Sequence, residues 1–582
     1  HSYAPDPKTP PVNISLNFTT PAGKAFSIQL GRIAHKEWFL CHHRLAPDVI
    51  ALVAHGATLS SISVTNGRNP EDRVLYFNSL ATFTETFAPL TFAPRHQRGI
   101  QLFPACNPGA NTGPGTLPFP NTPLTIIPRD SASSVIRVIK SNDGHYLLVR
   151  DGEDGRLEVR LPSKAGTWDD LAMRWTDKGE WLPVGLGGGL YFASENSKGS
   201  PFRATTETIK ITTDGKSVTY SGSLIASNRI SKVNIRFHLV GKSLAMDIQA
   251  DSGHIYEVRF GGTRGFVNPR LVTLPYYTYD GYSDGLARPA VIVSGTADAP
   301  LFFLAQIDWT QSNASIPFAD ASNLRFDGTL ASNGGTRYNL KTDGARNPCF
   351  ERFVLTLSPK FEDVLPNIPN PVSPWKHITG TRVWRAHGAH IRTNDADYWR
   401  TIHRWGMTQL VVTDHETGWR DNNESFTFRT NPAPKKGGDE GQFTYARIMQ
   451  DELGFVYGPY NNFTDFAPVN GYWHPDMISR SQDNQLQHAW TRCYAPKPAR
   501  AVEFCERLTP IIEKKFGFST AYCDVHTAVT PWSRVDYDAR VPGAGTFAAV
   551  FYAYGEIMLL QKAGWDGPVY SEGNNHFPYC GL

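Results

Sequence analysis

The sequence has few cysteines, and they follow no metal-binding pattern. Seven Cys occur in 582 residues, an odd number, and none shows the spacing of a zinc site. The C-terminal part holds Cys493, Cys505, Cys523 and Cys580. One disulfide among these four is compatible with the sequence, and no pairing is favoured. The cysteines therefore indicate no metal centre.

Long apolar runs and runs of one charge are also missing. The best apolar stretches, 49–54 and 301–305, are far too short to span a bilayer. No stretch of Lys and Arg reaches the density of a nucleic-acid footprint, and the net charge is only +3. These absences exclude a helical membrane span and a nucleic-acid partner.

Aromatic residues, by contrast, are abundant. They make up 12% of the chain, with 14 Trp and 23 Tyr. Aromatic rings stack on the apolar faces of sugars, and the polar edges of Tyr and Trp reach sugar hydroxyls. The cores of large β-domains use aromatics as well, and composition alone favours that interpretation. At 582 residues the chain is also too long for one core, so two or three domains are expected.

The chain starts at His1 without Met, as it would after removal of a signal peptide. Five Asn-x-Ser/Thr sequons are compatible with a glycoprotein, although this number is close to chance. We expect a secreted, periplasmic or cell-surface protein. The sequons lie at Asn13, Asn17, Asn313, Asn423 and Asn462.

Residues 1–357 are rich in short strand-like runs. Alternating or apolar segments recur every 8–12 residues, with Asp-Gly and other glycine-containing turns between them. This rhythm predicts stacked antiparallel sheets, a β-sandwich. The clearest predicted strands are 135–140, 146–150, 157–161, 232–239, 244–250 and 255–260.

A proline-rich segment, 358–376, follows the β-rich part. Proline at this density continues neither a β-ladder nor a helix, so the segment is interpreted as a semi-rigid linker at a domain boundary. The prolines are Pro359, Pro366, Pro369, Pro371 and Pro374.

Residues 377–582 alternate between apolar strands and helices that close on glycine, which indicates βα units and a parallel sheet. Long loops after the strands, 414–436 and 458–497, favour the first part of a (β/α)8 barrel with its site at that face. The predicted strands are 381–384, 409–413, 455–457, 520–523 and 568–571. The predicted helices are 395–405, 441–453, 498–516 with a kink at Pro510, and 546–563 with a stop at Gly564.

Only five such strands precede Leu582, whereas a closed barrel needs eight. Three explanations remain open. The chain is a fragment that continues in a missing C-terminal segment, a second chain supplies the remaining strands, or the sheet is a smaller open one.

Two of the predicted strands end on carboxylates. Asp524 follows Tyr522-Cys523, and Glu572 follows Tyr570-Ser571. The C-terminal ends of adjacent parallel strands meet in one cleft, their backbones about 5 Å apart. Glycoside hydrolysis needs such a pair, one ionised and one protonated. Singly, each residue could equally be a helix cap or a ligand of a structural ion. Together they favour catalysis.

Other polar and aromatic residues lie near these strand ends. The group Asp414-His415-Glu416 ends the second strand, where it could bind Ca²⁺ or sugar hydroxyls, or simply cap a helix. No other cofactor is expected. On the loop after strand three, Asp465 and Asp476 suggest either sugar contacts or loop anchors. The remaining predicted substrate-binding residues are Tyr472, Trp473, His474, His526, Trp532, Asn574 and His576.

The motifs Tyr-Cys-Asp-Val-His (522–526) and Tyr-Ser-Glu-Gly-Asn-Asn-His (570–576), after a sandwich and a linker, resemble the α-N-acetylgalactosaminidases of glycoside hydrolase families 101 and 129. A related α-glycosidase family is an equal alternative. The resemblance implies a galactose-mutarotase-like sandwich followed by a (β/α)8 barrel. It further implies that Asp524 is the nucleophile and Glu572 the acid/base, and that Asp414 corresponds to a calcium site.

The leading hypothesis is therefore a retaining hydrolase of α-linked glycans. Two alternatives remain. A polysaccharide lyase would also combine a large sandwich with loops rich in Tyr, His and Arg. A non-catalytic carbohydrate-binding or structural surface protein would be consistent with an incomplete barrel.

Overall fold

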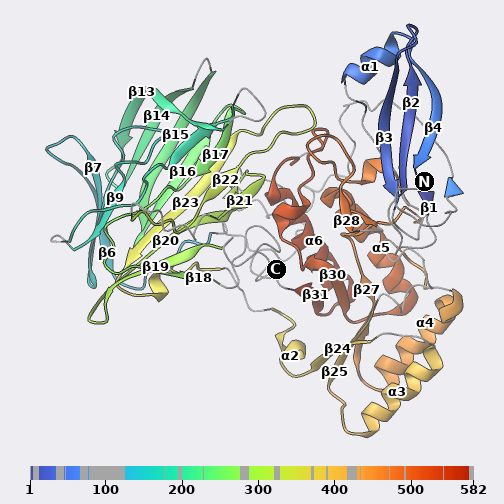
Figure 1. Ribbon diagram of the computed structural model, residues 1–582. Helices are drawn as coiled ribbons and strands as arrows, with labels where there is room; N and C mark the ends of the chain where they lie inside the picture. The colour runs from blue at the N-terminus through green and yellow to red at the C-terminus, as the bar shows by residue number, and fades with distance from the viewer. Residues whose placement is uncertain are drawn as a thin grey trace.

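The computed structural model has three parts: an N-terminal sheet, a β-sandwich and a C-terminal α/β region (Figure 1). None of the helices described is both long and apolar enough to cross a membrane. The structure describes residues 2–3, 12–33, 45, 47–65, 76–77, 125–176, 179–194, 200–226, 229–274, 288–319, 328–368, 373–387, 391–415, 429–432, 434–468, 470, 472–490, 493–541, 543–573 and 575.

The N-terminal strands form sheets of their own, on the far side of the α/β region from the sandwich (Figure 1). In the three-stranded sheet, β2 lies between β3 and β4, and its side chains alternate between buried and half-buried. A short antiparallel pair joins β1 to β5. The elements are β1 Ser2–Tyr3, β2 Val12–Thr19, β3 Ala25–Ile33, α1 Pro47–Ala54, β4 Thr58–Thr65 and β5 Tyr76–Phe77.

Three antiparallel sheets make up the sandwich. A five-stranded sheet has the order β10-β9-β8-β7-β6, a second has the order β12-β11-β17-β22-β21, and an eight-stranded sheet has the order β13-β14-β15-β16-β23-β20-β19-β18. The strands are β6 Ser134–Lys140, β7 Tyr146–Gly152, β8 Gly155–Arg160, β9 Ala172–Trp175, β10 Leu182–Pro183, β11 Gly189–Phe192, β12 Phe202–Arg203, β13 Thr205–Thr213, β14 Ser217–Ala226, β15 Arg229–Val240, β16 Ser243–Ala250, β17 Ile255–Arg259, β18 Arg270–Thr273, β19 Ala290–Thr296, β20 Ala299–Ser312, β21 Ile316–Phe318, β22 Gly335–Arg337 and β23 Cys349–Ser358.

Period-two patterning builds these sheets, and each of the six strands named from the sequence overlaps an observed strand. Along β15 every second side chain is buried from Val233 to Leu239, so one face enters the core and the other meets solvent. Gly241, at φ 57°, makes the tight turn into β16. Between the sheets, Phe260 stacks on Phe353 with ring centroids 3.9 Å apart.

The proline-rich segment is not a free linker over its first residues. The 3₁₀ turn η3 (Glu362–Val364) packs on the sandwich, because Val364 is fully buried and its carbonyl accepts a hydrogen bond from Gln306 at 2.9 Å. Asp363 pairs with the buried Lys242. A one-turn helix, α2 (Lys376–Thr379), closes the segment.

The C-terminal region alternates strands with helices, as predicted. Its elements are β24 Val383–His387, α3 Arg392–Arg404, β25 Leu410–Asp414, η5 Pro434–Lys436, α4 Gly438–Arg447, η6 Ile448–Glu452, β26 Val456–Gly458, β27 Tyr460–Asn461, η7 Pro475–Met477, β28 His488–Trp490, β29 Cys493–Tyr494, α5 Pro498–Phe516, β30 Ala521–Thr527, η8 Pro531–Arg534, α6 Phe547–Trp565 and β31 Val569–Gly573.

Two three-stranded parallel sheets, β24-β25-β26 and β27-β30-β31, are joined by one interrupted strand, which consists of β26 and β27. β26 pairs with β25, and β27, one residue further along, pairs with β30. Between them, the Pro459 carbonyl accepts the Tyr522 N–H at 3.0 Å. The parallel order is thus β24, β25, β26/β27, β30, β31. Across the ranges described, no ladder joins β31 to β24, so five strands are seen rather than a closed eight-stranded barrel.

Helix ends differ from the prediction in two places. α6 does not stop at Gly564 but continues to Trp565, and Asp566 caps it at φ 47°. Gly564 serves packing instead, because a Cβ there would collide with Thr509 of α5. The predicted helix 441–453 is α4 followed by the π-helical turn η6.

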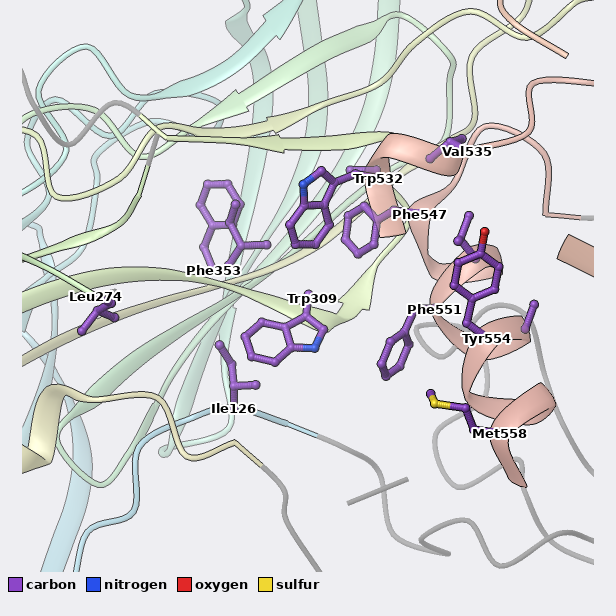
Figure 2. Close-up of a cluster of buried hydrophobic side chains, with 14 of the residues drawn as sticks. Ile126, Leu274, Trp309, Phe353, Trp532, Val535, Phe547, Phe551, Tyr554 and Met558 are labelled. Atoms are coloured by element: carbon purple, nitrogen blue, oxygen red, sulfur yellow. The ribbon is translucent and has the colours of Figure 1, made fainter. Parts of the chain in front are cut away.

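Apolar side chains join the sandwich to the α/β region. Trp532 of η8 and Phe547 of α6 meet edge to face, with ring centroids 5.6 Å apart, in a cluster that includes Trp309 of β20 (Figure 2). Main-chain bonds reinforce the contact. The Phe547 N–H donates to the Ala314 carbonyl at 3.0 Å. The two parts therefore share one continuous core.

This contact gives the first prediction. Phe547→Ala should destabilise the protein by about 3 kcal/mol or more, because it opens a cavity where the two parts meet. The exposed Phe443→Ala should change stability by less than about 0.5 kcal/mol. Thermal unfolding of both variants measures the difference, and equal melting temperatures would contradict a shared core.

Candidate active site

The two predicted carboxylates lie on neighbouring strands. β30 and β31 run parallel, with Tyr522 opposite Tyr570 and Cys523 opposite Ser571. Successive residues of a strand point to opposite faces, and Cys523 contacts Gln561 of α6 on the helix side. Asp524 and Glu572 follow these paired residues, so both strand ends carry a carboxylate at the same edge of the sheet.

A bulge in β30 lies directly opposite Glu572. Pairing resumes only at Thr527 with Gly573, so three residues of β30 face the single Glu572. Within the bulge, Val525 has φ 67°, which is unfavourable for a β-branched residue. The Val525 N–H donates to the Glu572 carboxylate, and the Thr527 hydroxyl donates to the Glu572 carbonyl. The strained bulge therefore holds Glu572 beside Asp524.

The charges around Glu572 favour its protonated form. Partial burial raises the pKa of Glu572, and the negative charges of Asp524 and Asp465 raise it further. The Val525 N–H and His415 act in the opposite direction. The net effect is a carboxyl group that keeps its proton to higher pH than a free glutamic acid does.

Asp524 is half-buried and held by polar side chains from the neighbouring strand β27 and the residue after it. The Tyr460 hydroxyl donates to Oδ2 of Asp524 at 2.7 Å. Nδ2 of Asn462 lies 3.5 Å from the same oxygen. Tyr460 is itself 3% exposed. A carboxylate that accepts such bonds is fixed in orientation.

Below the carboxylates, aromatic rings cover the inner face of the curved sheet. Trp384 of β24 stacks on Tyr522 and Tyr570, with centroids 5.6 and 5.5 Å apart, although β24 is paired with neither strand. His415 lies against Tyr460 at 5.8 Å. Rings in this arrangement suit the apolar face of a sugar.

His526 supports the bulge from behind. Its Nδ1 lies 2.7 Å from the Asp524 carbonyl oxygen, which can only accept, so Nδ1 carries the proton. Burial lowers the pKa of His526 to about 4, and the ring is therefore neutral at pH 7. It packs edge-on against Tyr554 of α6. The side chain is fully buried and braces the main chain next to Asp524.

Asp414 is not brought to this edge. It is buried on the helix side of β25, where it accepts a 2.6 Å bond from Tyr457 and pairs with Arg392 of α3 at 3.3 Å. Its immediate neighbour His415 faces the candidate site instead.

Among the residues described, no cluster of three His, Cys, Asp or Glu side chains could hold a metal ion. Glu416, Asn574 and His576 lie outside the described residues.

The loop residues after strand three are spread over different surroundings. Asp465 is buried near Asp524, whereas Asp476 pairs with Arg540 at 2.9 Å. Tyr472, exposed, contacts Phe504 of α5. The other predicted residues have their own contacts: Trp473 lies against Phe466 and Tyr494, His474 caps η7, and Trp532 is buried against the sandwich.

Several site residues were not predicted. Trp384, Tyr460, Asn462 and Arg534 come from three separate segments, and only folding brings them near Asp524. The signal for two of them was present in the sequence. Tyr460-Asn461-Asn462 is a polar run at a strand end, like those that marked Asp524 and Glu572.

Comparison with solved structures finds the same fold in a glycoside hydrolase. The α-N-acetylgalactosaminidase NagBb from Bifidobacterium bifidum, as a quadruple mutant, is 13% identical, with 72% of this chain and 76% of that chain covered and a TM-score of 0.50. Its Gal-NHAc-DNJ complex is 12% identical, with 73% of this chain and 76% of that chain covered and a TM-score of 0.50. The resemblance drawn from the sequence is thus confirmed at the level of the fold.

A weaker likeness, at TM-score 0.41, is to the glycoside hydrolase family 36 α-galactosidase AgaA from Geobacillus stearothermophilus, which is 11% identical over 74% of this chain and 73% of that chain. No family model matches the sequence, and no curated protein does.

The strain at the bulge is testable. Val525→Gly should stabilise the fold by about 1 kcal/mol, because glycine adopts φ 67° at little steric cost. The same change at the exposed strand residue Val383 should destabilise, since its backbone is extended. Thermal unfolding of both variants checks the sign, and a loss of stability in Val525→Gly would contradict strain at this position.

Proposed function

We propose that this protein is a retaining glycoside hydrolase acting on α-linked glycans, with Asp524 as nucleophile and Glu572 as acid/base. The observation that carries the proposal is the pairing of the two carboxylates across the β30–β31 bulge, one accepting hydrogen bonds and the other with a raised pKa. Two carboxyl groups in such different environments suit the nucleophile role for Asp524 and the acid/base role for Glu572.

In the first step, an oxygen of ionised Asp524 attacks the anomeric carbon. The bond from that carbon to the leaving oxygen breaks, and Glu572 gives its proton to the leaving oxygen. A glycosyl ester on Asp524 and a free alcohol result. The hydrogen bond from Tyr460 fixes the direction of the attacking carboxylate.

In the second step, the ionised Glu572 takes a proton from water as the water oxygen attacks the anomeric carbon. The ester bond breaks, Asp524 leaves as a carboxylate, and Glu572 is protonated again. Two inversions give net retention. The reaction consumes only water and the glycoside, so it balances with protein side chains alone.

The fold shared with NagBb and the aromatic inner face support a sugar as the group that is bound. Trp384, Tyr522 and Tyr570 offer a wall of rings beneath the carboxylates. We propose that the sugar stacks there, and that its anomeric carbon faces Asp524.

Asp524→Asn tests the nucleophile. It should lower kcat on any α-glycoside that the wild type hydrolyses by at least about 1,000-fold, because the amide cannot form the ester intermediate. Release of nitrophenol from a panel of nitrophenyl glycosides measures this. Asp397→Asn, an exposed carboxylate on α3, should leave kcat unchanged. Full activity in Asp524→Asn would end the proposal.

Glu572→Ala tests the acid through pH and leaving group. In the wild type, kcat/KM should fall as pH rises through the raised pKa of Glu572, because the acid form is lost. The variant should lose about 100-fold or more on alkyl glycosides, lack this alkaline fall, and keep most of its first-step rate on dinitrophenyl glycosides, which need no proton. Glu440→Ala, exposed on α4, is the control. An equal loss on both substrate types would contradict the acid role.

A further inference from the structure

A buried ion pair lies behind Asp524 that the proposed reaction does not use. Asp465, on the loop after β27, is 4% exposed, and Arg534, at the end of η8, is 8% exposed. The nearest charged atoms of the two side chains are 3.5 Å apart. Breaking such a pair by removing one partner leaves an uncompensated buried charge, so the two residues depend on each other.

Asn462 connects this pair to the catalytic carboxylate. Its Oδ1 accepts the N–H groups of Thr464 and Asp465, each at 2.9 Å. This fixes the orientation of the amide, because only Oδ1 can accept. Nδ2 must then point to the acidic side chains. It lies 3.1 Å from Oδ2 of Asp465, 3.3 Å from the Tyr460 hydroxyl and 3.5 Å from Oδ2 of Asp524.

Tyr460 completes the path. Its hydroxyl can accept from Asn462 while it donates to Asp524 at 2.7 Å. The Asp465 carboxylate accepts from Nδ2 of Asn462, the same Nδ2 faces the Tyr460 oxygen, and the Tyr460 hydroxyl donates to Asp524. Two side chains therefore link Asp465 to Asp524.

Arg534 lies next to the apolar contact between the sandwich and η8 in the sequence. Two residues before it, Trp532 packs against Phe547 in the cluster shared with β20 (Figure 2). The Arg534 charge also acts on His526 of β30 and Tyr554 of α6. The segment that packs against the sandwich through Trp532 therefore also places a buried positive charge behind the bulge of β30.

The same pair sets the charge around Glu572. The groups that act on Glu572 are Asp524 and the Val525 N–H from β30, Asp465 from the loop after β27, and His415 after β25. Those that act on Asp465 are Arg534, Asp524 and the side chains of Asn462 and Thr464. Arg534 pairs with Asp465, so it compensates part of the negative charge that Asp465 brings to the site.

We infer that Asp465 and Arg534 are positioning residues, which orient Asp524 through Asn462 and Tyr460 and set the charge next to the two carboxyl groups. The inference rests on the proposed function. It assigns the pair a part in the reaction although neither side chain is exposed enough to serve as a substrate contact.

Opposite charge changes at the two positions test this inference. Asp465→Asn keeps the shape of the side chain and removes a negative charge. The alkaline limb, the pH at which kcat/KM falls to half on the alkaline side, should therefore move to lower pH by about half a unit. Arg534→Met removes the compensating positive charge and should move the limb up. Arg534→Lys should hold it near the wild-type position. Each variant should lower kcat about tenfold or more with little change in KM, except Arg534→Lys, which should recover most of kcat.

The measurement is the pH profile of each folded variant on a nitrophenyl glycoside that the wild type hydrolyses. A purely structural role would lower activity without moving the limb, or would move it in the same direction in Asp465→Asn and Arg534→Met; either result overturns the inference. If Asp465→Asn does not fold, the Arg534→Met and Arg534→Lys profiles decide alone, since identical limbs would contradict charge control. A wild type without activity on any α-glycoside would instead count against the proposed function.

Discussion

The position of β30 between β27 and β31 is the constraint on which the candidate site depends. Parallel pairing brings the ends of all three strands to one edge, and the period of two points Cys523 at α6 and leaves Asp524 at the site. The bulge then accommodates three residues opposite Glu572. In a regular ladder, Val525 and His526 would pair with residues of β31 one by one. The Val525 N–H would then not reach the Glu572 carboxylate.

The sandwich supports this edge of the sheet, because it packs against η8 and α6, the two elements that lie next to β30. Its contact with η8 and α6 is apolar at the centre and closed by main-chain hydrogen bonds around it. η8 ends at Arg534 and α6 carries Tyr554, and both residues lie behind the bulge. The five parallel strands described are thus supported next to the two carboxylates.

Much of this fold follows from local patterns. Alternation predicted the strands of the sandwich, and apolar runs closed by glycine predicted the βα units, because those signals act within a few residues. Asp414 shows the limit. Its place at a strand end was evident, but only the paired sheet decides that it faces Arg392 and not the site.

Other parts of the structure depend on contacts between distant segments. Asp465 and Arg534 lie on either side of β30 in the sequence, so no local pattern joins them. Pro459 splits strand three between two partners, which periodicity does not reveal. The carboxylate pair could be predicted because each member ends its own strand. The residues that hold Asp524 come from a distant segment of the chain, so only the tertiary structure identifies them.

The most direct test of the central claim is to trap the covalent intermediate. A 5-fluoroglycosyl fluoride of the sugar that the wild type accepts should react with the enzyme and stay attached, because the fluorine slows release of the ester. After proteolysis, mass spectrometry should find one sugar adduct on the peptide that contains Asp524, and none in Asp524→Asn. An adduct on another residue, or turnover of the wild type with inverted product and no adduct, would contradict the account.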